Sequence, residues 1–284
     1  MRKIISFIIL LLFIALCWEG IKWIGGDPWR PDKNPLGITH TPPIRIQVVS
    51  DLNLPHLWDI GLAFSNPARR NGPPLAGVLV NAALFTFREA IIGFLFGGIL
   101  GLSLAILFAH FNLLERGCMP YIVASQMVPI LAIAPMVIIW LKAGWFSVAV
   151  IAAYLTFFPV TINTLRGLRS PEPMAIELMR SYAASRWAIL WKLRFPAALP
   201  SIFTAFKISA TASIVGAIIG ELPSGIRDGL GGAILNFNQY YISGPAKLWA
   251  AIVVSALVGI AFYLIIMLIE AFSLRGRKAL ADQV

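Results

Sequence analysis

Residues Glu177 to Pro196 read ELMRSYAASRWAILWKLRFP, and this stretch decides how the rest of the chain is interpreted. It is basic and aromatic, yet it lies between hydrophobic runs that are long enough to cross a bilayer. On a helix, Met179, Ala183 and Trp187 would share one face, with most of the basic side chains on others. The pattern indicates an amphipathic helix. Because connections between membrane helices are usually short, the long polar loop 166–200 that contains it indicates a docking surface.

The composition excludes a soluble globular protein. The chain has 284 residues, of which 58% are hydrophobic and 13% are charged, and its mean hydropathy is +0.80. Ordinary soluble domains carry about 25% charged residues. Apolar runs of about 18 or more residues recur, and each could cross roughly 30 Å of hydrocarbon as a helix. The sequence therefore predicts an all-α polytopic membrane protein with about six transmembrane helices.

The apolar runs divide the chain into predicted segments. The predicted spans are 4–24, 78–109, 119–141, 145–165, 202–220 and 248–272. Interior prolines are expected to bend the third and fourth of them, at Pro120, Pro129, Pro135 and Pro159. The first is kept as a span because no small-x-small cleavage site follows its basic start. The predicted domains are an N-terminal transmembrane helix (1–24), an extracytoplasmic loop (25–74), a transmembrane domain (75–275) and a cytoplasmic tail (276–284). The loop is rich in proline and glycine and shows little helical periodicity.

The charge pattern orients these spans in the membrane. From Arg166 to Lys207 the chain carries seven basic residues against two acidic ones, Glu172 and Glu177. Cytoplasmic loops are enriched in Lys and Arg, which places the 166–200 loop in the cytoplasm. Six spans then put both termini on that side too, in a multi-pass protein of the cell (inner) membrane. Loop 25–74 also holds basic residues, but at a lower density. The bases flank membrane segments and no nucleic-acid motif surrounds them, so no nucleic-acid partner is predicted.

Small and polar residues inside the spans suggest packing and pathway positions. Gly93, Gly97 and Gly101 recur every fourth position and predict a stripe where another backbone approaches closely. Polar side chains inside a span need a partner or water, so they are either pathway residues or helix-packing hydrogen bonds. The pathway candidates are Gln126, Asn163, Ser209, Thr211, Ser213 and Glu221. Lys207 is predicted to anchor its helix by snorkelling to the cytoplasmic face.

Several catalytic motifs are missing from the sequence. It has no G-x-x-x-x-G-K-[ST] phosphate loop, so the chain is not expected to bind the phosphates of ATP through such a loop. It also lacks HExxH and G-x-S-x-G, and it shows no paired carboxylates within the spans that would suggest an intramembrane enzyme. The protein is therefore predicted not to be an enzyme, to bind no cofactor directly, and to depend on a separate subunit for any ATP hydrolysis.

The 177–196 stretch resembles the cytoplasmic signature of ATP-binding-cassette (ABC) importer permeases, E-A-A, three residues, G, nine residues, I-x-L-P. This chain has Glu177-Leu178-Met179, Ala183, Leu193 and Phe195-Pro196 at that spacing. It departs from the family by replacing both alanines, the glycine, the isoleucine and the leucine, and Ala183 narrows the freedom of the turn. SYAASRWAILWKLRFPAALPSI and GAIIGELPSG are similar to the nitrate, sulfonate and taurine branch of the type I permease fold.

The resemblance implies partners and roles. In this family the segment folds into short coupling helices that insert into the ATPase subunit. The residues expected to couple to the ATPase are Glu177, Arg180, Ala183, Ser185, Trp187, Leu193 and Pro196. Further expected partners are a second permease copy in a homodimer, the lipid bilayer, and an extracytoplasmic substrate-binding protein that docks near 225–241. The partner subunit would use ATP to move a small organic solute, such as a sulfonate-like anion or a pyrimidine-type vitamin precursor.

Three other interpretations remain open from the sequence. The 177–196 helix could lie on the membrane surface, held by anionic lipid and aromatic anchors. The chain could be an ion-coupled secondary transporter, although that class usually has coupling carboxylates, broken helices and paired repeats. It could also be a non-transporting membrane scaffold that recruits a cytoplasmic partner. Co-purification with an ATP-binding subunit discriminates among them.

Overall fold

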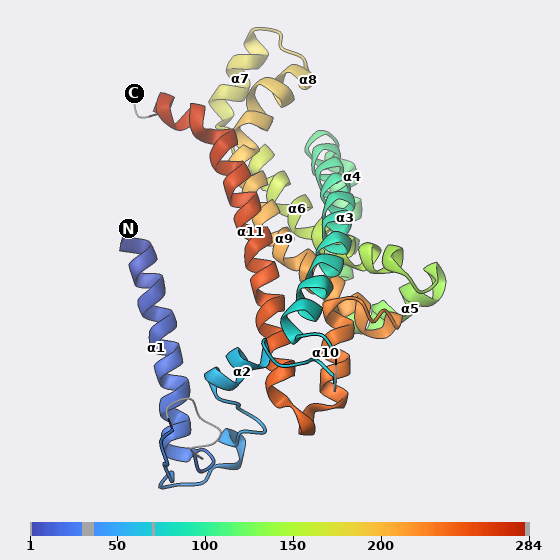
Figure 1. Cartoon of the computed structure of the whole chain (residues 1–284). Coiled ribbons are helices and arrows are strands. Elements are labelled where there is room, and N and C mark those ends of the chain that lie inside the picture. Colours follow the sequence, from blue (N-terminus) through green and yellow to red (C-terminus); the bar gives the residue numbers. More distant parts are fainter. Residues whose placement is uncertain (1, 30–36, 70–71, 282–284) are drawn as a thin grey trace. The chain divides into compact units, whose positions relative to one another are not determined.

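The computed structural model describes residues 2–29, 37–69 and 72–281, and it confirms the all-α class (Figure 1). The helices are α1 (Arg2–Gly25), α2 (Leu57–Ala63), α3 (Leu75–His110), α4 (Asn112–Ser125), α5 (Ile130–Leu141), α6 (Trp145–Leu168), α7 (Pro173–Ser181), α8 (Arg186–Ile189), α9 (Phe195–Ser224), α10 (Leu230–Gln239) and α11 (Pro245–Ala281). The chain forms two compact units, one of residues up to 81 with 233–254, and one of 82–232 with the residues from 255 onward.

Within the described residues, four helical segments are long and apolar enough to cross a membrane. They are α3, α6, the continuous run from Arg186 to Ser224 that contains α8 and α9, and α11 from Pro245 to Leu274. The bent pair α4 and α5 adds a fifth if it counts as one span. Helix α1 is helical over the predicted first span, and its crossing of the membrane stays a prediction.

The predicted span 119–141 is divided between α4 and α5, which are separate helices with 99° between them. The chain leaves the helix after Gln126, and Pro129 precedes the first residue of α5. Proline has no N–H to continue a helix and disfavours helical geometry in the residue before it. Pro120 and Pro135, by contrast, lie inside α4 and α5 without ending them.

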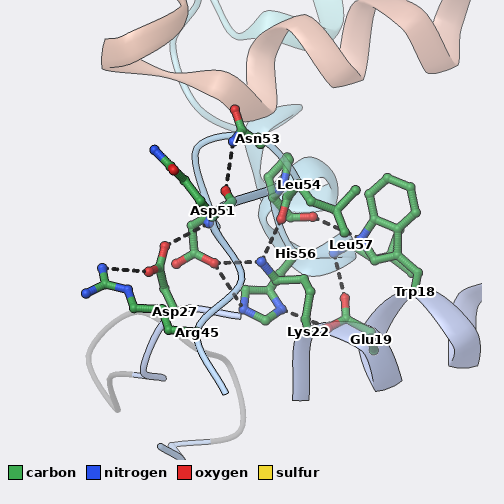
Figure 2. Close-up of polar contacts among 12 residues, drawn as sticks. Trp18, Glu19, Lys22, Asp27, Arg45, Asp51, Asn53, Leu54, His56 and Leu57 are labelled. Carbon is green, nitrogen blue, oxygen red and sulfur yellow. Dashed lines mark hydrogen bonds and ion pairs between the residues drawn. The ribbon is translucent and has the colours of Figure 1, made fainter. Parts of the chain in front are cut away.

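In the first unit, a polar network ties residues 51–57 to the end of α1 (Figure 2). The fully buried Lys22 donates to Asp51 Oδ1 and to the Leu54 carbonyl oxygen, both at 2.6 Å. His56 Nδ1 lies 2.7 Å from Glu19 Oε2, and the Leu57 N–H donates to the other oxygen of Glu19. Helix α2 begins there, as a short helix of 7 residues within the predicted loop 25–74. Residues 30–36 and 70–71 of the loop lie outside the described residues.

In the second unit, α6 packs along α9, and α3 packs against α6 through its glycines. A Cβ placed on Gly97 would lie 2.5 Å from the Ala153 carbonyl oxygen, and one on Gly101 would lie 2.6 Å from that of Phe157. Real Cβ atoms do not approach backbone this closely, so the absence of side chains lets the two helices meet. The predicted stripe therefore lies against another helix of the same chain.

Candidate functional site

The segment Pro173–Ile189 projects from one end of the second unit as α7 and α8, beyond the neighbouring ends of α6 and α9 (Figure 1). Pro173 opens α7, where its missing N–H is not needed. Ala183 follows α7 with φ 55°, a left-handed conformation that favours glycine. Ser185 then caps α8, accepting a hydrogen bond from the Ala188 N–H at 3.2 Å. The expectation of one amphipathic helix that contains Met179, Ala183 and Trp187 is therefore wrong, because Met179 lies in α7 and Trp187 in α8.

Apolar and aromatic side chains of this segment are exposed on the surface of the chain. Met174 is 77% exposed, Leu178 58%, Tyr182 79% and Trp187 60%. The predicted coupling residues lie along it: Glu177, Arg180, Ala183 and Ser185 are exposed, while Leu193 and Pro196 at its base are partly buried. Exposed apolar groups beside charged ones are typical of a surface that meets another protein.

The base of the segment is fixed to the body of the second unit. Leu190, in a short π-helical turn (Leu190–Arg194), is fully buried in the core cluster that includes Phe108 and Leu168. Arg194 Nη1 donates to the Ala109 carbonyl oxygen at 3.2 Å, and the Trp187 ring lies 4.8 Å from that of His110. The projecting helices are thus attached to the ends of α3, α6 and α9, so a force on them would reach the membrane helices.

The pathway candidates have mixed surroundings. Ser209 donates to the Thr156 carbonyl oxygen across the α6–α9 contact at 3.2 Å. Asn163, Thr211 and Ser213 bond to carbonyl oxygens of their own helices. Gln126 lies at the end of α4, and its buried side-chain nitrogen has no partner among the described residues. These bonds suit helix packing, and a pathway role for the six residues stays a prediction.

Glu221 belongs to a buried carboxylate pair that the sequence analysis missed. Its Oε1 accepts from the Thr86 hydroxyl at 2.6 Å, and its Oε2 accepts from the Gly231 N–H at 2.5 Å. Glu89, which is 1% exposed, lies three residues after Thr86 on α3, and its carboxyl interacts with that of Glu221. The statement that the spans hold no paired carboxylates is therefore wrong. The sequence did contain one signal for this site: Thr86 and Glu89 are polar residues one helical turn apart in an apolar run, which indicates a polar partner on one face of the helix.

Lys207 forms an ion pair that the sequence did not predict, and its snorkelling to the cytoplasmic face stays a prediction. Its Nζ lies 2.8 Å from Glu270 Oε2 of α11, and both side chains are about one-fifth exposed, at 18% and 20%. A carboxylate within reach holds the ammonium group where it lies, because a buried charge without a partner is costly. The sequence could not show this pairing, since the two residues belong to different spans.

A cavity of about 750 Å³ lies beside α4. Its lining mixes charged and apolar residues: Asn112, Glu115, Arg116, Met119, Pro120, Val123, Ala124, Met127 and Arg169. The Arg169 guanidinium forms an ion pair with Glu115, which joins the end of α6 to the start of α4. Helix α4 has no buried residue within this chain, and Tyr121 and Met127 are 78% and 77% exposed. This face is therefore open to lipid or to another protein.

Comparisons with known proteins agree with this geometry. The family model described as "Binding-protein-dependent transport system inner membrane component" matches residues 93–273. The riboflavin transport system permease protein RibX of Chloroflexus aurantiacus is 34% identical over 200 residues, 70% of this chain and 74% of that protein. The formylaminopyrimidine transport permease protein ThiX of Halalkalibacterium halodurans is 32% identical over 187 residues, 66% of this chain and 74% of that protein.

A solved structure shares the fold. The crystal structure of an amino acid ABC transporter with histidines superimposes with a TM-score of 0.54 at 14% sequence identity. The match covers 70% of this chain and 94% of that chain. At this identity the likeness concerns the arrangement of helices and not the transported molecule.

Proposed function

Because this chain belongs to the family of binding-protein-dependent transport system inner membrane components, we propose that its α7–α8 segment couples the membrane helices to the ATPase of an importer. The protein is the permease subunit of an ABC importer, and such a permease works with an ATPase subunit and a substrate-binding protein. The observation that carries the proposal is the exposed α7–α8 segment on a buried base.

The coupling would be mechanical. We propose that the ATPase subunits bind and hydrolyse ATP and that this chain binds no nucleotide itself. When ATP draws the two ATPases together, α7 and α8 move with them as rigid levers and shift the ends of α3, α6 and α9. The different affinity of ATP for the two conformations supplies the free energy. Exposed Leu178 and Trp187 would fill an apolar groove of the ATPase, with Arg180 orienting the contact.

A second copy of the permease is proposed to lie against α4 and α5. Their exposed surface carries Tyr121, Ile139 and Trp140, which are 78%, 74% and 72% exposed. Charged residues Glu115 and Arg116 line the cavity on this face, and charged groups are costly against lipid tails. A two-fold homodimer would cover the face and surround a route with it.

The orientation proposed for the chain places both termini and α7–α8 in the cytoplasm. A cysteine introduced as Ser185→Cys, on exposed backbone between α7 and α8, is expected to escape an impermeant thiol reagent in intact cells. It should react fully once the membrane is opened. The native Cys17 and Cys118 are also exposed, so both are first replaced by serine. Labelling of Ser185→Cys from outside intact cells would show that α7–α8 lies outside the cytoplasm and that the proposed topology is inverted.

The proposed solute is a small nitrogen heterocycle of the vitamin or vitamin-precursor type. RibX and ThiX, by their names, carry riboflavin and formylaminopyrimidine. The paired Lys207 is neutralised by Glu270, so it does not attract a sulfonate into the helix bundle. A sulfonate-like anion is the second candidate.

The substrate proposal predicts ATP-driven uptake of one solute class. Vesicles are prepared with the permease, its ATPase and its binding protein, with ATP inside. Accumulation of labelled aminopyrimidine or riboflavin is expected, and unlabelled taurine in excess should not compete. The control vesicles contain an ATPase whose hydrolysis is disabled. Accumulation of taurine in place of the heterocycles would favour the sulfonate candidate, and uptake without ATP would contradict the importer mechanism.

A further inference from the structure

We propose that Glu89 and Glu221 form a proton-binding site, in which a protonated Glu89 donates a hydrogen bond to an ionised Glu221 and so holds α3, α9 and the first turn of α10 together. Both residues are 1% exposed and belong to the second unit. Glu89 lies one helical turn from Thr86, whose hydroxyl donates to Glu221 at 2.6 Å, so the two carboxyl groups lie close enough to interact. The site goes beyond the coupling and substrate proposals; the infrared test does not depend on coupling, whereas the pH-profile test rests on the proposed coupling to the ATPase.

The hydrogen bonds around Glu221 identify it as the ionised member. It accepts from the Thr86 hydroxyl at 2.6 Å and from the Gly231 N–H at 2.5 Å. Gly231 lies in the first turn of α10, where backbone N–H groups are unpaired and the helix dipole favours a negative charge. Donors directed at both oxygens stabilise a carboxylate, because an ionised carboxyl can only accept.

Glu89 has the opposite surroundings. Neither of its carboxyl oxygens has a hydrogen-bond donor among the described residues, although both are buried. Two ionised carboxyls facing each other away from water would repel, and each would lack solvation. One proton on Glu89 removes the repulsion and supplies a further donor to Glu221. The neighbouring charged residues, Arg88 on α3 and Arg227 and Asp228 before α10, are exposed, and the structure shows no ion pair between them and the two glutamates.

The backbone is shaped around this pair. A Cβ on Gly231 would lie 2.7 Å from Glu221 Cβ and 2.5 Å from the Ile218 carbonyl oxygen, and one on Gly229 would collide with the Glu221 carboxyl. The Leu230 N–H donates to Thr86 Oγ1 at 2.8 Å, which extends the network by one link. Removing the proton would set Glu89 against Glu221 and loosen the Thr86, Leu230 and Gly231 contacts. The proton on Glu89 therefore stabilises the turn between α9 and α10.

Infrared spectroscopy tests the proton directly in the purified full-length complex with its ATPase. The wild-type protein should show the carbonyl band of a buried protonated carboxyl at neutral pH, and Glu89→Gln should remove it. Asp228→Asn, which removes an exposed carboxyl from the same turn, should leave the band unchanged. A wild-type spectrum without the band, or a band that persists in Glu89→Gln, would overturn the proposal.

The pH profile of binding-protein-stimulated ATP hydrolysis tests whether the proton on Glu89 stabilises the α9–α10 turn. Glu89→Gln keeps a donor for Glu221, so its activity should stay within about twofold of the wild type at neutral pH, whereas Glu89→Leu should lose about tenfold. Wild type and Asp228→Asn should lose stimulation at alkaline pH, where the proton leaves, and Glu89→Gln should not. If Glu89→Gln lost as much stimulated ATP hydrolysis at alkaline pH as the wild type, the proposed role of the proton would be wrong. It would also be wrong if activity required sodium, or if one proton were taken up with each solute.

Discussion

Gly97→Ala is expected to destabilise the second unit by about 2–3 kcal/mol, whereas Gly98→Ala, one position along the same helix, should be neutral or stabilising by about 0.5–1 kcal/mol. The new methyl group of Gly97→Ala would lie 2.5 Å from the Ala153 carbonyl oxygen, so α3 and α6 must move apart. At Gly98 the nearest atom is the ring of Phe206, at 3.9 Å, which is an ordinary contact. Backbone cannot yield as a flexible side chain can.

The matched glycines separate packing from the general effect of alanine in a helix. Thermal unfolding midpoints of the detergent-purified variants give the comparison, and Gly97→Leu should remove the folded, monodisperse peak altogether. Because the stripe meets α6 of the same chain, loss of folding and not only of dimerisation is the expected result. Equal midpoints for Gly97→Ala and Gly98→Ala would place the stripe away from α6 and refute the packing.

Hydropathy and spacing predicted the helices of the second unit well. The runs predicted at 78–109 and 145–165 are α3 and α6, within a few residues at each end. The interior prolines predicted a bend in 119–141, but its place between α4 and α5 was not predicted, because 119–141 is apolar throughout and hydropathy does not show where a helix ends. Pro129, directly before α5, marks the bend, whereas Pro135 inside α5 does not.

The candidate sites were predictable where the signal is local and hidden where it depends on tertiary structure. The 177–196 stretch carries its motif in one run of sequence. Glu89 and Glu221, in contrast, become a pair only when α3 packs beside α9, and the same holds for Lys207 and Glu270. A buried charge in an apolar run does indicate that some partner exists, but neither spacing nor composition identifies it.

Ala183→Arg is expected to lower binding-protein-stimulated ATP hydrolysis at least tenfold, while Ala183→Gly should keep it and raise the unfolding free energy by about 1 kcal/mol. Ala183 has φ 55°, so glycine relieves strain at the turn between α7 and α8. Arginine shares the strain of alanine but adds a bulky charge to a surface that must fit a groove. Glu177→Lys, on the adjoining helix α7, adds no backbone strain. It should still uncouple ATP hydrolysis from the binding protein, because it reverses a charge on the surface that must fit the groove.

The control for these variants is Ala197→Arg, an exposed position at the start of α9 beyond the projecting segment. It adds the same charge to the same basic side of the protein and should leave stimulation unchanged. All four variants should reach the membrane, and Ala183→Arg should lose its ATPase during purification or hydrolyse ATP without responding to the binding protein. If Ala183→Arg kept both the bound ATPase and the response, α7 and α8 would lie on the lipid surface. The coupling role would then belong to another part of the chain.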